Sequence, residues 1–155
     1  MLKPKFEAHS LLLIILDLLA IKGISEFYTD YFERALLELK KKSTKLKLSA
    51  LMGNINFYYV SDVDKYFSDE IDAGFTDLVI SRFLDYELLI HKNCYIYHFR
   101  KNTKKSNRHG LEKKAYEIKN ELREKYNIKI STNQLTRMIN VFIEEYAKFE
   151  PSNTR

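Results

Sequence analysis

The segment from residue 60 to residue 99 constrains the fold most, because two helical patterns and a β-hairpin follow one another within it. A helix is expected from the N-cap at Ser61 to a turn at Gly74, and a second helix over residues 76–88. Alternating residues then follow on both sides of Lys92-Asn93, which suits a tight hairpin turn. The expected cross-strand pairs are His91 with Cys94, Ile90 with Tyr95, Leu89 with Ile96, Leu88 with Tyr97 and Glu87 with His98.

The rest of the chain favours a mainly α (α+β) fold. With 45% hydrophobic residues but only 4 Gly and 2 Pro in 155 residues, the chain can bury a substantial core and lacks the turn composition of a β-sandwich. Helices are predicted over residues 7–22, ending at Gly23, and over residues 25–42. The β-prone residues 55–60 are predicted to form a short strand that pairs with the hairpin.

In this order of elements, residues 55–99 resemble the winged helix-turn-helix family, and the resemblance implies a winged-helix-like core with the hairpin as its wing. In members that bind DNA the second helix enters the major groove, which implies groove-facing positions at Thr76, Asp77, Ser81, Arg82 and Asp85. DNA phosphates must be neutralised by Lys or Arg, yet this helix offers a single base among acids. The same surface is therefore a candidate for binding a basic protein, through Asp77, Ser81, Arg82 and Asp85.

Charge is divided unevenly along the chain. Residues 61–90 hold eight acids and two bases, whereas residues 91–155 hold fifteen bases and seven acids. A basic run at the wing tip and behind the hairpin is a candidate nucleic-acid-binding site: Lys92, Arg100, Lys101, Lys104, Lys105, Arg108, Lys113 and Lys114. Tyr95, Tyr97 and Phe99 precede it and would suit stacking on single-stranded bases. The alternative is that these aromatic residues are core and the charge keeps a linker soluble.

The C-terminal third is predicted to be a helical hairpin. Residues 1–99 would form the N-terminal part, 100–109 a basic linker, 110–150 the hairpin and 151–155 a tail. The second of its helices loosely resembles the dimer-forming helix of ribbon-helix-helix proteins. That resemblance implies a homodimer through an apolar stripe, although the stripe could instead pack back on the N-terminal part. Its members are Leu135, Met138, Ile139, Phe142, Ile143 and Tyr146.

No enzyme motif is present. The sequence has no glycine-rich phosphate loop, no Gly-x-Ser-x-Gly and no His-Glu-x-x-His, so a non-enzymatic protein without a cofactor is expected. His91, Cys94 and His98 would share a face of the hairpin but lack the fourth ligand of a closed zinc site, so no metal is expected. The apolar run at residues 11–21 contains Asp17 and is too short to span a membrane. A buried helix and a cytoplasmic protein follow.

Two functions fit the sequence. One is binding of DNA or single-stranded nucleic acid through the basic wing and linker, in transcription or replication control. The other is a protein-binding adaptor or inhibitor whose acidic winged helix engages a basic partner.

Overall fold

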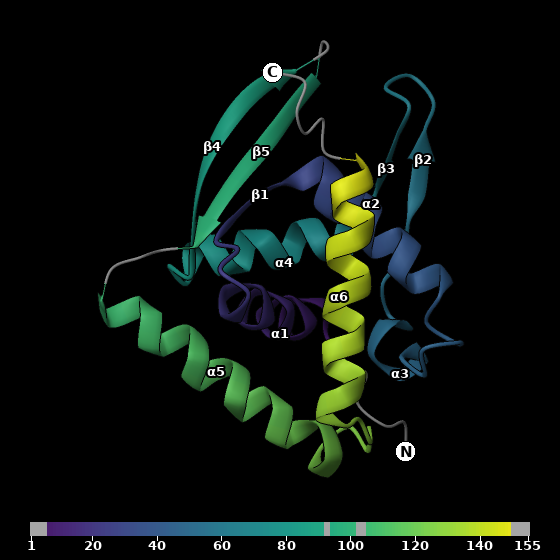
Figure 1. The fold of residues 1–155 in the computed structure, drawn as a ribbon. Coiled ribbons are helices and arrows are strands. Elements are labelled where there is room, and N and C mark those ends of the chain that lie inside the picture. Colours follow the sequence, from purple (N-terminus) through teal and green to yellow (C-terminus); the bar gives the residue numbers. More distant parts are fainter. Residues whose placement is uncertain (1–5, 92–93, 102–104, 150–155) are drawn as a thin grey trace.

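The computed structural model describes residues 6–91, 94–101 and 105–149, with side chains for residues 6–88 and 110–149 (Figure 1). The fold is mainly helical with a small antiparallel β-hairpin, which confirms the predicted class. The helices are α1 (Ala8–Ile21), α2 (Thr29–Lys41), α3 (Ser49–Met52), α4 (Asp69–Ile80), α5 (Lys105–Glu124) and α6 (Thr132–Phe149). The strands are β1 (Glu26–Tyr28), β2 (Tyr58–Val60), β3 (Lys65–Phe67), β4 (Leu84–His91) and β5 (Cys94–Lys101).

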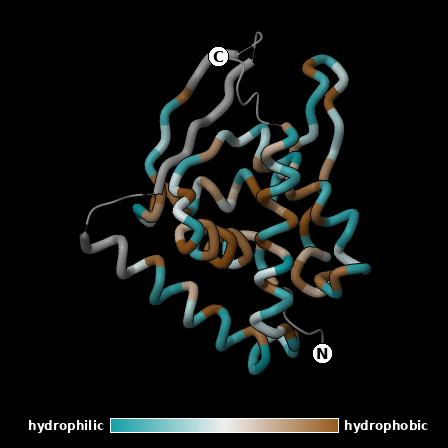
Figure 2. Tube along the Cα trace, in the orientation of Figure 1, coloured by the Kyte–Doolittle hydropathy of each residue, from teal (hydrophilic) through white to brown (hydrophobic). Residues whose placement is uncertain are grey.

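Helix α1 is the centre of the molecule, as its apolar residues on every side predict. Residues 11–16 are all buried, and α4, α5 and α6 pack around the helix (Figure 2). The one acid in the run, Asp17, is buried and accepts a hydrogen bond from Lys119 Nζ of α5 at 3.4 Å. Gly23 follows the helix with φ of 80°, the left-handed conformation expected of a C-terminal cap. No described helix is long and apolar enough to cross a membrane.

Three of the described strands form one antiparallel sheet. Strand β5 lies between β1 and β4, so the first strand of the chain pairs with the second strand of the long hairpin. The elements α1, β1, α2, α4 and the β4–β5 hairpin follow one another in that order. The segment between α2 and α4 contains α3 and a separate hairpin, β2–β3.

Several elements lie at other residues than the sequence predicts. The strand that pairs with the β4–β5 hairpin is β1, not residues 55–60. Residues 65–67, expected to be helical, form a strand, and the helix expected over residues 76–88 is replaced by the end of α4 and the start of β4. The helix-turn-helix predicted around Gly74 is therefore one helix preceded by a hairpin.

Local contacts explain the difference. Tyr59 and Tyr66 pair across the β2–β3 hairpin with ring centroids 5.1 Å apart, and Asp64 tolerates the positive φ of 53° that the turn requires. Helix α4 is capped by Ser68, whose Oγ accepts from the Ile71 N–H, instead of by Ser61. Gly74 lies in mid-helix because α1 passes close by: a Cβ there would lie 2.6 Å from a methyl carbon of Leu12.

The β4–β5 hairpin confirms the predicted register. All five expected cross-strand pairs are present, from His91 with Cys94 to Glu87 with His98. The register extends further than predicted, to Leu84 opposite Lys101. Arg82, a left-handed residue, ends the turn that follows α4, and β4 begins two residues later.

The C-terminal helices complete the same hydrophobic core. Leu111, Ala115, Ile118 and Leu122 of α5 are buried, as their spacing predicts, and α5 packs on α1. Helix α6 packs mainly on α2, where Lys42 Nζ donates to Glu145 Oε1 at 2.6 Å. Residues 100–101 end β5 and residues 105–109 begin α5, so most of the predicted linker belongs to regular elements.

Candidate protein-interaction surface

The exposed side of α4 is acidic. The helix sequence, DEIDAGFTDLVI, contains four acids and no Lys or Arg. Ile71, Gly74, Phe75 and Leu78 are buried, which leaves Asp69, Asp72, Ala73, Thr76, Asp77 and Ile80 exposed. Three acids in the first turn also suit the helix dipole, so the local sequence favours a helix that begins here. These acids would repel the phosphates of a DNA duplex, whose binding requires Lys or Arg.

A buried carboxyl group lies behind this helix. Glu33 of α2 is 1% exposed and interacts with Asp72 and with the backbone of Ser68. Burial, together with the hydrogen bond to Asp72 and the nearby charges of Asp72 and Asp30, raises the pKa of Glu33 to about 11. Glu33 is therefore protonated at neutral pH and adds no charge to the exposed side of α4.

Tyrosines of the β2–β3 hairpin hold two of the neighbouring acids. The Tyr58 hydroxyl donates to Asp69 Oδ1 at 2.9 Å, and the Tyr59 hydroxyl donates to Asp64. Both hydrogen bonds raise the pKa of the tyrosine, because they favour its protonated form. Tyr58 and Tyr59 remain 47% and 49% exposed, so the β2–β3 hairpin places aromatic rings beside carboxylates at the N-terminal end of α4.

Apolar side chains are exposed at the other end of α4 and on the neighbouring strand. Ile80 is 73% exposed, and Tyr86 and Leu88 of β4 are 51% and 49% exposed. Asp85 and Glu87 alternate with them along β4 and are exposed as well, on the opposite face of the strand. We refer to the exposed residues of α4 together with residues 85–88 as the α4–β4 surface. Apolar side chains among charged ones are the usual composition of a protein-binding site.

Two of the four predicted partner-binding residues belong to this surface, and the other two lie in the turn between α4 and β4. Asp77 is on α4, Ser81 is the C-cap, Arg82 is in the turn with φ of 65°, and Asp85 is on β4. All four are exposed. The sequence patterns do not identify Ile80, Tyr86 and Leu88 as exposed, because a helix predicted over residues 76–88 would place Ile80 and Leu88 in the core.

The predicted nucleic-acid-binding residues are spread over several elements. Lys92 and Lys104 lie outside the described residues, Arg100 and Lys101 end β5, and the others are on α5. Lys101 lies at the opposite end of β5 from Cys94, roughly 23 Å away at the usual rise per residue. Arg100 is opposite Glu26 on one side and Asp85 on the other. Of the side chains described, Lys113 and Lys114 are exposed.

The predicted dimerisation stripe faces its own chain. Leu135, Met138, Ile139 and Phe142 are buried, and Ile143 and Tyr146 are half-buried against the same core. Phe142 packs on Phe32 of α2 with ring centroids 4.7 Å apart. The Tyr146 hydroxyl accepts from the Tyr28 N–H at 2.9 Å. The dimer expected through this stripe is therefore corrected to an intramolecular contact, and a homodimer would have to use another surface.

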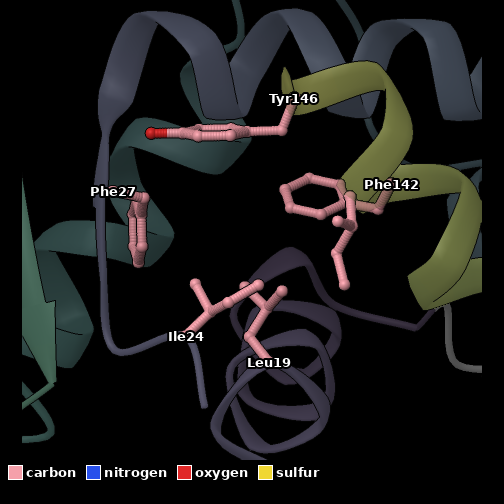
Figure 3. A pocket seen from close by; sticks show the side chains of 6 residues that line it. Leu19, Ile24, Phe27, Phe142 and Tyr146 are labelled. Carbon is pink, nitrogen blue, oxygen red and sulfur yellow. The ribbon is translucent and has the colours of Figure 1, made fainter. Parts of the chain in front are cut away.

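A small apolar pocket lies between α1, β1 and α6 (Figure 3). It is lined by Leu19, Ile24, Phe27, Phe142, Ile143 and Tyr146, with no charged side chain among them. Its one polar group, the Tyr146 hydroxyl, already accepts from the backbone of Tyr28. The pocket thus has no group to orient a polar substrate. Among the described residues there is also no cluster of three or more His, Cys, Asp or Glu side chains that could hold a metal ion.

Comparison of the chain with protein-family models, with curated proteins and with solved structures found no match.

Proposed function

We propose that this protein is a non-enzymatic, cytoplasmic adaptor that binds a basic partner protein through the α4–β4 surface. The observation that carries the proposal is the charge of α4. Helix α4 exposes Asp69, Asp72 and Asp77 and has no basic residue. A duplex would be repelled by these charges, whereas a basic protein would be attracted.

The apolar residues at the edge of the surface support a protein partner in particular. Charge alone steers a partner and excludes wrong ones, while desolvated apolar and aromatic side chains supply most of the affinity in protein interfaces. Ile80, Tyr86 and Leu88 are exposed beside the acids and can supply that contact. The carboxylate of Asp69 is also held in place by Tyr58, which lowers the entropic cost of binding a base.

The test uses the full chain as bait in extracts of its native host, with bound proteins identified by mass spectrometry. A double variant, Asp77→Lys with Ile80→Ser, reverses one charge and removes one apolar contact on α4. Glu117→Lys on the exposed side of α5 makes the same charge change elsewhere and is the matched control. We expect a basic protein to bind the wild type and the control but not the double variant. Capture of nucleic acid alone, or of proteins that all bind the double variant equally, would contradict the proposal.

A second candidate function is nucleic-acid binding by the start of α5. Lys113 and Lys114 are exposed, and Tyr116 beside them is 66% exposed, so an aromatic ring adjoins positive charge. Lys105 and Arg108 belong to the same helix. This surface does not overlap the α4–β4 surface in sequence, so a protein partner and a nucleic acid could be bound by one chain.

Binding of labelled duplex and single-stranded DNA across a salt series tests this second function. Changing Lys105, Arg108, Lys113 and Lys114 of α5 to Gln should weaken binding and reduce the steepness of log K against log salt by up to roughly 3.6 on duplex DNA and roughly 2.8 on single strands, for four lost phosphate contacts. No binding at low salt, or a slope that the four substitutions leave unchanged, would contradict it.

A further inference from the structure

Strand β4 forms an edge of the three-stranded sheet. The strand order is β1, β5, β4, and no strand in the described part of the chain pairs with the outer side of β4. Among the β4 side chains that the structure describes, Leu84 at the start of the strand is buried and the next four residues are all exposed. At 8 residues β4 is long for an edge, and the backbone N–H and C=O groups on its outer side are a template for another strand.

One row of residues across this sheet alternates in charge, and the next row ends in an acid at β4. Glu26 of β1 is opposite Arg100 of β5, which is opposite Asp85 of β4. Two residues along, Tyr28 is opposite His98 and His98 is opposite Glu87. Opposite charges on neighbouring strands stabilise a sheet, and like charges destabilise it. A fourth strand beside β4 would continue these rows favourably with a basic residue opposite Asp85 and another opposite Glu87.

The other face of the sheet carries aromatic and aliphatic residues, so apolar residues of an added strand would match it. Phe27 of β1 is opposite Phe99, and Phe99 is opposite Tyr86. Phe27 is buried in the core, whereas Tyr86 and Leu88 at the edge are about half exposed. Apolar residues of an added strand would cover the rings and methyl groups that the core leaves exposed.

We propose that the outer edge of β4 binds an extended segment of a partner protein in which Lys or Arg alternates with apolar residues, so that the sheet gains a fourth strand. This inference rests on the proposed function, because the partner is the basic protein that the α4–β4 surface binds. It adds how that partner binds: main-chain hydrogen bonds give affinity, and the alternating side chains give specificity. A second copy of this chain fits poorly, since antiparallel pairing of β4 with itself about Tyr86 or about Glu87 places acids opposite acids.

The experiment measures binding of two labelled synthetic peptides, Lys-Val-Lys-Val-Lys-Val-Lys and Glu-Val-Glu-Val-Glu-Val-Glu, to the full chain by fluorescence anisotropy. We expect the Lys-Val peptide to bind at least tenfold more tightly than the Glu-Val peptide, and to slow hydrogen exchange of β4 amides. The double variant Asp85→Lys with Glu87→Lys should reverse the preference. If that variant does not fold, Asp85→Asn with Glu87→Gln should abolish it.

Two outcomes would overturn the inference: a preference unchanged by these substitutions, or binding without protection of β4 amides. Methylation of alternate peptide nitrogens gives an independent readout. Methylation of the set of nitrogens that points toward β4 should abolish binding, and methylation of the other set should not. A contact made only by side chains would tolerate both. A host partner that depends on Asp77 and Ile80 while neither peptide protects β4 would leave the proposed function standing and contradict strand addition alone.

Discussion

At the scale of single residues, the buried carboxyl of Glu33 gives stability an unusual dependence on pH. Its pKa rises from an ordinary 4.5 to about 11, so the folded chain retains a proton that the unfolded chain loses. The stability associated with protonated Glu33 is therefore fully present below about pH 4.5 and is lost as the pH rises toward 11. No spacing in the sequence distinguishes Glu33 from the surface acids of α2, because its burial depends on α4 and β3 packing over it.

We predict that Glu33→Gln stabilises the protein increasingly as the pH rises. The amide keeps the shape and a donor toward Asp72 but has no proton to lose. The difference in unfolding free energy between variant and wild type should grow by up to about 1.4 kcal/mol per pH unit above pH 4.5. Urea unfolding followed by circular dichroism at several pH values measures it, with Glu117→Gln on the α5 surface as control. A difference independent of pH would contradict the assigned protonation.

Arg82 carries backbone strain that glycine would relieve. Its φ of 65° lies in the left-handed region, and the Phe83 N–H donates to the Leu78 carbonyl around it at 2.9 Å, as in a helix-terminating Schellman turn. We predict that Arg82→Gly stabilises the chain by about 1 kcal/mol, or roughly 2–4 °C in Tm. Arg82→Ala keeps the Cβ and should give no such gain in the same thermal melts. Equal Tm values for the two variants would show that the φ of Arg82 costs little.

At the scale of elements, α6 is a structural helix of the core and not a surface for a second copy. Its ring contacts with α2 and its hydrogen bond to β1 join the two ends of the chain. We predict that Phe142→Ala lowers the unfolding free energy by about 3–5 kcal/mol, because the ring leaves a cavity among buried side chains. Asn140→Ala, on the exposed side of α6, should change it by less than about 0.5 kcal/mol. Chemical denaturation measures both, and a small effect of Phe142→Ala would place α6 outside the core.

Other elements show what sequence patterns could and could not predict. The β4–β5 register was predictable because side chains alternate with a period of two and a two-residue turn fixes the pairing. The start of α4 was not, because Ser61 and Ser68 are both good N-caps and only the packing of the hairpin and of α1 selects between them. The sequence predicts Gly74 at a turn. It lies instead in mid-helix, where a Cβ would come within 2.6 Å of a methyl carbon of Leu12 on α1.

At the scale of the whole molecule, one core includes residues from α1 through α6. A chain that ends at residue 104 would lack α5 and α6 and would expose the faces of α1 and α2 that they cover. We predict that this truncated chain does not fold. If residues 1–99 were instead an independent folding unit, the truncated chain would give a dispersed NMR spectrum. The proton–nitrogen correlation spectrum of the truncated chain decides between them, and a dispersed spectrum would show that the C-terminal helices are dispensable.

Local patterns in the sequence predict the central apolar helix, the hairpin and its register, the stripes of α5 and α6, and the division of charge between the acidic middle and the basic end. Each of these depends on residues close together in the chain. Long-range packing is what pairs β1 with the β4–β5 hairpin, buries the stripe of α6 in its own chain, buries Glu33 and leaves β4 as an exposed edge. Those features depend on contacts between residues far apart in sequence, whose free energy no local pattern contains.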